Sequence, residues 1–333
     1  MSVVENFEFV LPTRIIYGAG CIQQLPDEIK KMKHKRPMIV TDKGLIEAGI
    51  VKRITDILEE AKIEYVIYDG IQPNPRDTTV MEAAEFAKKK NTDMLIAIGG
   101  GSSMDTAKAV GVILKEGGEI GDYEGLGMVT EPIVDLVAIP TTVGTGSEVT
   151  FWSVITDTKR HFKMSVGSPF IAARLAMVDP DLVETLPPSI VAATGMDALT
   201  HAIEGYITLA HNEMSDMFHM KAIKMIFKYL PAAVNDKDEE AIEMMGLAQY
   251  IAGMGFSNVG LGIVHSMAHQ LGAVYDTPHG IANAMLLPTV MRFNGEVCAD
   301  RFREILINIG RPDAANLNDQ DVINTFVWMI SEL

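Results

Sequence analysis

The stretch IAIGGGSSMDTAKAVGVIL, residues 96–114, changes its periodicity at three consecutive glycines. Before the glycines it is a continuous apolar run, which is typical of a strand buried on both faces. After them, apolar residues recur at the spacing of a helix. We therefore expect a strand over residues 93–101 and a helix from Ser103 to about Leu114.

The glycine turn is itself a candidate phosphate site. Gly99, Gly100 and Gly101 carry no Cβ, so a ligand can approach the backbone closely. The free N–H groups and the dipole of a helix N-terminus favour a pyrophosphate at this place. Ser102 and Asp105 have the spacing of a capping box. An ordinary capped turn would have the same sequence, and neither GxGxxG nor GxxxxGK[ST] occurs.

The same alternation of strand and helix continues outward from this unit. We expect helices over about residues 45–61 and another that ends near Lys90, and strands over residues 36–42, 63–69 and 134–140. Apolar strands separated by amphipathic helices predict a parallel sheet with helices on both faces, a Rossmann-like α/β domain.

The pattern changes after residue 150. Residues 151–167 read as two short strands joined by a polar turn, and residues 174–180 as one further strand. From Pro187 onward, helical periodicity dominates. We therefore expect an α/β domain over residues 1–186 and an all-helical domain over residues 187–333, because 333 residues exceed most single hydrophobic cores.

The composition excludes several classes of partner. The formal net charge is −16, and a chain this acidic repels nucleic acid and anionic lipid. Only two cysteines occur, which fits a reducing compartment better than a disulfide framework. The N-terminus has no signal-peptide pattern, and no apolar run reaches a membrane-spanning length. We expect a cytoplasmic protein.

Hydroxyl side chains follow the strand over residues 134–140. The sequence PTTVGTGSEVT places Thr141, Thr142, Thr145 and Ser147 just beyond its carboxyl end. Open α/β sheets bind ligands at that edge. A hydroxyl-rich turn is also common in proteins where it binds no ligand.

Histidines and one aspartate in the helical part suggest a metal site. Asp197 and His201 are four residues apart in a predicted helix, as are His265 and His269, and His279 follows in a turn. A carboxylate with several imidazoles suits Fe²⁺ or Zn²⁺ better than Mg²⁺ or Ca²⁺. Five candidates exceed a tetrahedral set by one. His34, His211 and His219 stand in polar contexts, and we assign them to the surface.

Four segments together resemble the iron-containing (group III) alcohol dehydrogenases: GGGSSMDTAKA, PTTVGTGSEVT, GMDALTHAIEGY and GLGIVHSMAHQLGAVYDTPHG. The resemblance spans essentially the whole chain. It implies a dehydroquinate-synthase-like architecture, with the active site in a cleft between the two domains. It also implies a dimer or a larger homo-oligomer.

The resemblance implies a role for individual residues. The metal ligands would be Asp197, His201, His265 and His279. His269 would lie beside them without binding the metal, and it is our candidate for relaying the alcohol proton. Phe256 and Trp152 would line the substrate pocket. Contacts to NAD would come from Asp42, Asn74, Gly100, Gly101, Ser102, Thr141, Thr142, Thr145 and Lys163.

The implied reaction is hydride transfer between NAD(H) and a short-chain primary alcohol or diol, or the matching aldehyde. The chain departs from the family in two ways. It ends at WMISEL, earlier than we expect for the family, and Trp152 replaces a smaller polar residue found in a related enzyme. We therefore do not assign the substrate of that related enzyme to this chain.

Three other classes of function would use the same residues, and the first contains two kinds of zinc enzyme. A zinc polyol dehydrogenase like glycerol dehydrogenase would bind its metal with fewer histidines, and a dehydroquinate synthase would need a basic pocket, which we do not find. A metal hydrolase would need no glycine loop. An inactive binding protein would show no alcohol-dependent NADH formation.

Overall fold

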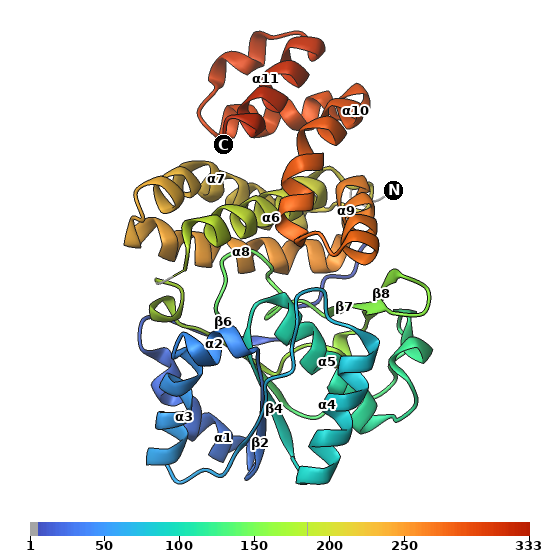
Figure 1. Cartoon of the computed structure of the whole chain (residues 1–333). Coiled ribbons are helices and arrows are strands. Elements are labelled where there is room, and N and C mark those ends of the chain that lie inside the picture. The colour runs from blue at the N-terminus through green and yellow to red at the C-terminus, as the bar shows by residue number, and fades with distance from the viewer. Residues whose placement is uncertain (1–5, 185) are drawn as a thin grey trace.

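The computed structural model describes residues 6–184 and 186–333, and it has an α/β part below a helical part (Figure 1). The start of the predicted first domain, residues 1–5, and Thr185 beside the predicted boundary lie outside the described residues. The chain passes from strand to helix between Val178 and Pro188. The division into domains at about residue 186 stays a prediction.

Six parallel strands form the main sheet, in the order β1-β9-β6-β4-β2-β3. This confirms the predicted α/β fold. The strands in this order are β1 Arg14–Tyr17, β9 Leu175–Val178, β6 Leu136–Pro140, β4 Met94–Gly99, β2 Pro37–Val40 and β3 Val66–Tyr68. The sequence analysis did not predict β1, which is only four residues long and partly exposed.

Helices cover both faces of the sheet, and the alternation along β4 explains why (Figure 1). Ile96 and Ile98 pack on the face that carries α1 and α3, whereas Leu95 and Ala97 pack on the face of α4 and α5. The helices are α1 Leu25–Met32, α2 Lys43–Glu47, α3 Ile50–Glu60, α4 Asp77–Lys90 and α5 Gly101–Lys115. The helix predicted over residues 45–61 is in fact α2 and α3, separated at Gly49, whose φ of 77° is left-handed.

A small second sheet confirms the predicted hairpin. β7 Trp152–Asp157 and β8 Phe162–Gly167 pair antiparallel, and β5 Gly125–Leu126 pairs with β8. Short 3-10 helices complete this part of the chain: η1 Cys21–Gln24, η2 Ile120–Tyr123, η3 Pro169–Ile171 and η4 Pro180–Leu182.

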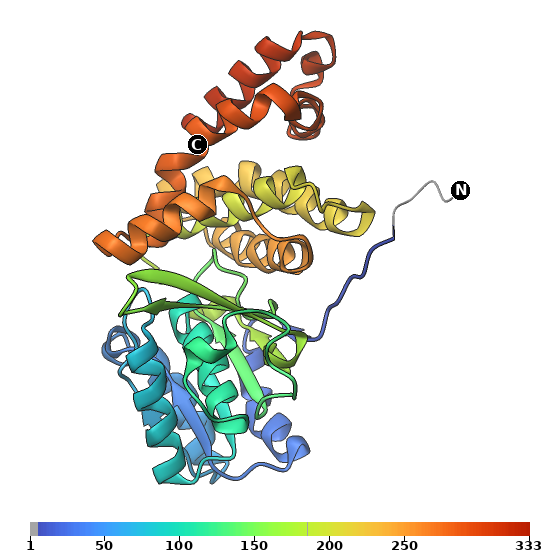
Figure 2. The ribbon, with the colours of Figure 1, turned by 90° about the vertical axis from the view of Figure 1, so that its right-hand side faces the viewer.

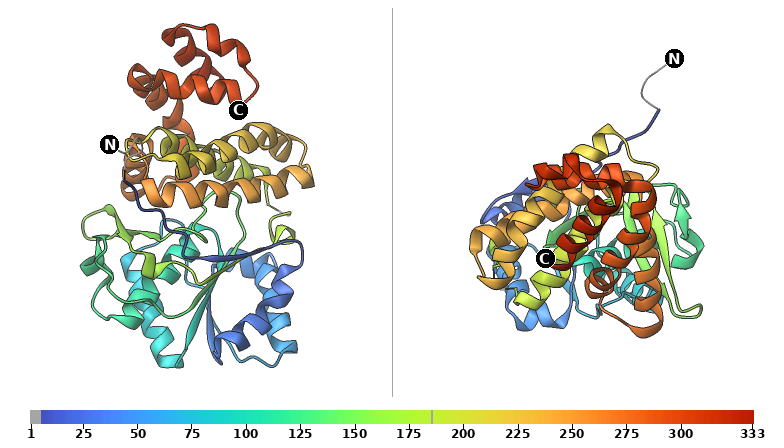
Figure 3. Two further views of the ribbon diagram at one scale, coloured as in Figure 1. Left: turned by 180° about the vertical axis from the view of Figure 1, so that it is seen from behind. Right: turned by 90° about the horizontal axis from the view of Figure 1, so that it is seen from above.

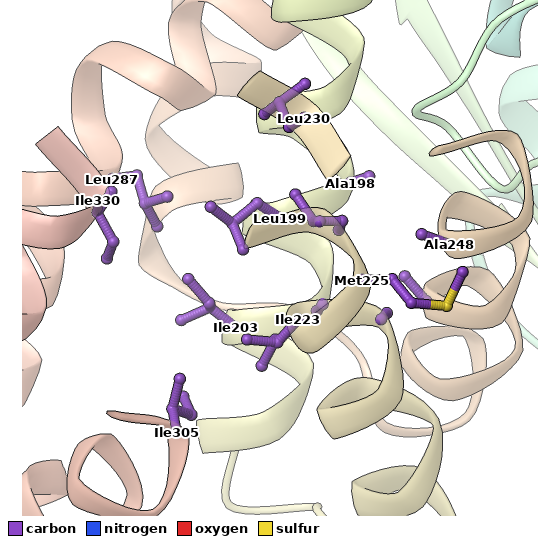
Figure 4. Close-up of a cluster of buried hydrophobic side chains, with 14 of the residues drawn as sticks. Ala198, Leu199, Ile203, Ile223, Met225, Leu230, Ala248, Leu287, Ile305 and Ile330 are labelled. Atoms are coloured by element: carbon purple, nitrogen blue, oxygen red, sulfur yellow. The ribbon is translucent and has the colours of Figure 1, made fainter. Parts of the chain in front are cut away.

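The helical part has its own core. Its elements are α6 Pro188–Ile207, α7 Glu213–Asn235, α8 Glu239–Val259, α9 Ile263–Tyr275, α10 His279–Asn308, η5 Pro312–Asn316 and α11 Asp319–Ser331. Leu199 and Ile203 of α6 pack against Ile223 of α7 and Leu287 of α10 (Figure 4). Figures 2 and 3 show α11 and the end of α10 as the layer farthest from the sheet.

One buried histidine corrects the sequence analysis. His219 was assigned to the surface, but it is fully buried, while His34 is half-buried beside Asp135 and His211 is exposed. A Cβ added to Gly205 or Gly255 would collide with the His219 ring, so the glycines of α6 and α8 leave the space that the imidazole fills.

The segment after β6 joins the two parts. The backbone N–H of Gly146 donates to Gln249 Oε1 of α8 at 2.5 Å, and that of Phe151 donates to Ser257 Oγ at 3.1 Å. Lys108 of α5 holds the same segment, because its buried Nζ donates to the backbone oxygens of Ser147 and Trp152 at 2.7 and 2.8 Å. The carboxyl ends of the strands therefore face the helical part.

Among the described residues, no single helix is both long and apolar enough to cross a membrane. The pair α8 and α9 passes that test only jointly, and it bends by 101° at its break.

Candidate metal and nucleotide site

Four side chains from three helices converge at one point. Asp197 and His201 lie one turn apart on α6, His265 lies on α9, and His279 begins α10. One donor atom from each lies within 4.8 Å of the others. The Nε2 atoms of His201, His265 and His279 lie 3.9, 3.7 and 3.5 Å from Asp197 Oδ1. The structure therefore brings together the four residues that the resemblance implied as ligands.

The electrostatics of this four-residue cluster suit a cation. Burial raises the pKa of Asp197, but the three neighbouring imidazoles outweigh it and hold that pKa far below its usual range. Burial lowers the pKa of His201 to about 4 and that of His279 to about 3. These two imidazoles are therefore neutral at pH 7 and have a lone pair to give. Burial also lowers the pKa of His265, but the Asp197 and Glu204 carboxylates raise it to about 9. A metal ion at the cluster would displace the proton that His265 then carries on Nε2.

Asn283 of α10 reaches the same point, and the sequence analysis missed it. It is fully buried, and its Nδ2 donates to Asp197 Oδ1 at 2.6 Å. The same nitrogen lies 3.1 Å from His265 Nε2 and 3.2 Å from His279 Nε2. Three atoms of the cluster thus lie within hydrogen-bond distance of one nitrogen that has only two hydrogens, so the cluster converges on one point, as it would on a metal ion. The only sequence signal was its place one helical turn after His279.

Glu204 is a second missed residue. It is buried on α6, and its carboxylate accepts a hydrogen bond from His265 Nδ1 at 2.7 Å. It lies three positions after His201, so it shares a face of α6 with that ligand candidate. A single glutamate in a helix gives no sign in the sequence that it will contact a histidine 61 positions later.

His269 lies beside the cluster but outside it. Its ring centroid is 6.1 Å from that of His265 and 5.4 Å from that of His279. Burial lowers the pKa of His269. The relay prediction relied on an imidazole that titrates near neutral pH, and this burial argues against that part of it.

The glycine turn lies at the carboxyl end of β4, against the hydroxyl-rich segment after β6. A Cβ on Gly100 would lie 3.0 Å from Thr142 Cγ2, and one on Gly101 would lie 3.2 Å from Thr145 Cγ2. Thr141 N donates to Gly99 O at 3.0 Å, which joins the two segments. The predicted nucleotide residues of the two segments therefore form one surface.

The N-terminus of α5 differs from the prediction. Gly100 is the N-cap, no side chain caps the helix, and Ser102 is half-buried in its first turn. The capping box predicted for Ser102 and Asp105 is wrong, because the Asp105 carboxylate instead accepts hydrogen bonds from Ser147 Oγ at 2.6 Å and Val154 N at 2.9 Å. The first N–H groups of α5 therefore remain available to a ligand.

Asn74 and Lys163 lie between the two parts of the site. Lys163 Nζ donates to Asn74 Oδ1 at 2.6 Å, and Asn74 Nδ2 donates to Asp276 Oδ1 at 2.8 Å, just past the end of α9. A Cβ on Gly272 would lie 2.9 Å from Lys163 Nζ, so the lysine packs on α9 one turn beyond His269. These two residues therefore connect the α/β part with the helix that carries His265.

Asp42 follows β2 at the same edge of the sheet. Its Oδ1 accepts a hydrogen bond from Leu45 N at 3.0 Å and so caps α2. The side chain is half-buried. The other carboxylate oxygen has no protein partner within the described part of the chain, so Asp42 keeps an acceptor for a ligand.

The two predicted pocket residues differ in position. The Phe256 ring stacks on His201 with centroids 4.3 Å apart, so it borders the cluster directly. The Trp152 indole packs over Gly167, and its Nε1 donates to Ser257 O at 3.0 Å. Trp152 thus lies between the hairpin and α8, and none of its described contacts is with the four-residue cluster.

Comparison with known proteins gives the same picture. The model for "Iron-containing alcohol dehydrogenase" matches residues 12–180, and the model for "Fe-containing alcohol dehydrogenase family, C-terminal" matches residues 191–333. Lactaldehyde reductase from Escherichia coli is 47% identical over 87% of this chain and 76% of its own length.

Two solved structures are similar over nearly the whole chain. A 1,3-propanediol oxidoreductase has a TM-score of 0.94 and 37% identity, covering 98% of this chain and 86% of that one. A sulfoacetaldehyde reductase from Bifidobacterium kashiwanohense in complex with NAD⁺ has a TM-score of 0.85 and 33% identity, with the same coverage. The resemblance stated above is therefore confirmed: this chain belongs to the iron-containing alcohol dehydrogenase family.

Proposed function

We propose that this protein is a metal-dependent, NAD-linked oxidoreductase that transfers a hydride between a short-chain primary alcohol or diol and NAD, or in the reverse direction from NADH to an aldehyde. One observation carries the proposal. Asn74 and Lys163 connect the edge of the sheet that carries the glycine turn with α9, the helix that contributes His265 to the four-residue cluster. A metal hydrolase would have no need of the glycine turn.

Fe²⁺ is the proposed metal, and Zn²⁺ fits the same donors. Three imidazole nitrogens and one carboxylate oxygen are the ligand types that first-row divalent metals prefer. Asp197, His201, His265 and His279 would hold the ion. When bound, it would supply a Lewis acid for the oxygen of the alcohol or aldehyde. The family name and the buried donor set support iron.

NAD is the proposed second cofactor, and a similar enzyme has been solved with NAD⁺. The turn at Gly100 and Gly101 packs against Thr142 and Thr145 at the N-terminus of α5, which has no side-chain cap and suits a pyrophosphate. We assign further contacts to a set of polar residues at the same edge of the sheet: Asp42, Asn74, Ser102, Thr141, Thr142, Thr145 and Lys163. The bound nicotinamide would exchange the hydride.

The chain's own residues would prepare the reaction. The Phe256 ring, stacked on His201, would present an apolar wall to the substrate carbon. His269 lies one turn beyond His265 on α9 and, because burial lowers its pKa, would pass the alcohol proton on without holding it. Trp152 would restrict the pocket from the hairpin side.

We further propose that the enzyme works in the cytoplasm as a homodimer or larger homo-oligomer on free small molecules. Both cysteines are free thiols, Cys21 buried and Cys298 half-buried, which suits a reducing compartment. Phe293 and Val297 of α10 are 66% and 89% exposed, which supports self-association. Light scattering on the purified protein tests the oligomer.

An anaerobic assay tests the function. Purified protein is stripped with a chelator, reloaded with Fe²⁺ or Zn²⁺, and assayed for NADH formation with a panel of primary alcohols, diols and secondary alcohols. The proposal expects metal-restored activity on primary alcohols or diols. Absence of alcohol-dependent NADH formation, together with metal-dependent ester hydrolysis, would contradict it.

A further inference from the structure

Glu204 connects two helices at the edge of the four-residue cluster. Its side chain is 1% exposed and comes from α6. Its carboxylate accepts hydrogen bonds from Val264 N at 2.7 Å and His265 N at 3.3 Å, both in the first turn of α9. The same carboxylate accepts a hydrogen bond from His265 Nδ1 at 2.7 Å. One buried group thus caps α9 and holds the imidazole that this helix carries.

The hydrogen bond decides which nitrogen of His265 faces the cluster. A carboxylate can only accept, so the hydrogen is on Nδ1 and the ring turns Nε2 toward Asp197, 3.7 Å away. Asn283 Nδ2, a donor, lies 3.1 Å from the same Nε2. With Nδ1 committed to Glu204, Nε2 is the nitrogen that can offer its lone pair to a metal ion at the cluster.

His265 is the only one of the three imidazoles in the cluster that is held in this way within the described residues. Neither His201 nor His279 has a carboxylate at Nδ1, and the Nδ1 atom of His279 is buried without a hydrogen-bond partner there. The backbone before α9 also makes room for the carboxylate, because a Cβ on Gly262 would lie 2.7 Å from Glu204 Oε1. The site is thus built around one oriented imidazole.

We propose that Glu204 is a positioning residue for the metal site: it fixes His265 with Nδ1 protonated and Nε2 aimed at the ion, and it increases the donor strength of that nitrogen. This inference rests on the proposed function, since it needs a metal at the cluster. Partners of this kind typically change metal affinity by about 10–100-fold when they are removed.

Glu204→Gln tests the proposal with little change in shape. The glutamine oxygen can still accept from Val264 N, so the shorter of the two hydrogen bonds that cap α9 is kept, and only the 3.3 Å bond from His265 N is lost. Its amide N–H₂ then faces His265 Nδ1, and as a donor it favours the tautomer whose Nε2 carries the hydrogen. We expect Zn²⁺ affinity, measured on the metal-free full chain by competition with a chelator, to fall about 10–100-fold. The absorption bands of bound Co²⁺ should also change.

Glu28→Gln is the matched control. The Glu28 side chain is 3% exposed and accepts hydrogen bonds from Arg14 and Lys31 beside α1, in the α/β part. Its loss should lower stability without changing Zn²⁺ affinity. If Glu204→Gln does not fold, Glu204→Asp keeps the charge but draws the carboxylate away from His265, and it should weaken Zn²⁺ binding as well.

The outcomes separate this inference from the proposed function. Wild-type protein that binds no Zn²⁺ or Fe²⁺ would refute the metal site itself. A second outcome is that the wild type binds metal and a folded Glu204 variant binds Zn²⁺ equally tightly, with unchanged Co²⁺ bands. That result would overturn the role of Glu204 and leave the proposed function intact. If Glu28→Gln weakens Zn²⁺ binding as much as Glu204→Gln does, the effect is a general loss of stability. That result would also overturn the role of Glu204.

Discussion

Replacing Asp42 with asparagine tests whether this side chain selects NAD over NADP. Asp42 follows β2, where an acidic residue can accept hydrogen bonds from an adenosine ribose and repel a 2′-phosphate. Its Oδ1 also caps α2 through Leu45 N at 3.0 Å. Asparagine is about as good an N-cap as aspartate, so Asp42→Asn removes the negative charge and keeps the cap.

The expected magnitude follows from the half-buried position of Asp42. Two unit charges about 4 Å apart repel by roughly 1 kcal/mol in water and by roughly 4 kcal/mol near a protein surface. Since about 1.4 kcal/mol corresponds to a factor of ten, the wild type should prefer NAD by about 5-fold to on the order of 1,000-fold. Salt screens exposed charges, so the preference should shrink at high ionic strength.

The assay compares kcat/KM for NAD and NADP in the wild type, Asp42→Asn and Asp42→Gly. Both variants should lower the NAD preference. Only the glycine variant should lose the cap, at a few tenths of a kcal/mol in the free energy of unfolding. Equal use of NADP by the wild type, or the same cofactor ratio in Asp42→Asn, would refute the reasoning.

Three further substitutions test other parts of the site. His265→Ala should abolish metal retention and turnover, whereas His269→Ala should keep the metal and slow turnover; metal analysis that shows the reverse would invert the assignment. Gly100→Val should raise the KM for NAD far more than the KM for the alcohol, because the valine side chain would crowd Thr142 at the turn. An unchanged KM for NAD would show that the turn does not bind the cofactor. Lys108→Met should leave the backbone oxygens of Ser147 and Trp152 without their donor. Each such buried acceptor should lower the free energy of unfolding by about 1–3 kcal/mol. Unfolding in urea measures this, and an unchanged midpoint would contradict it.

The fold was predictable where apolar runs were long and buried on both sides. β4 and β6 have every residue buried, and their limits agree with the predicted strands to within about two residues. β1 was not predicted because its four residues are only partly buried at the edge of the sheet. The single helix predicted over residues 45–61 is two helices, because the left-handed backbone of Gly49 separates α2 from α3. Hydrophobic spacing alone gives no sign of this break.

The candidate site was predictable where residues of unusual type recur at helical spacing. Asp197, His201 and His265 were identified in that way. Asn283 and Glu204 were missed because their partners are 86 and 61 positions away in the chain, and only tertiary packing brings them together.

Local rules also failed where a distant group competed for a side chain. Asp105 has the spacing of a capping partner, but Ser147 and Val154 take up its carboxylate. His219 has polar neighbours in sequence, but Gly205 and Gly255 from two other helices leave an interior space for it. Neither competition is visible within one segment.

Deuterium transfer tests the central claim most directly. Iron-loaded protein is incubated anaerobically with NAD⁺ and a primary alcohol that carries two deuterium atoms on its hydroxyl carbon, and the nicotinamide product is analysed by mass spectrometry and NMR. Direct hydride transfer predicts one deuterium at C4 of NADH, at a rate that depends on the added metal. NADH without deuterium, or product formation that a chelator leaves unchanged, would contradict the account.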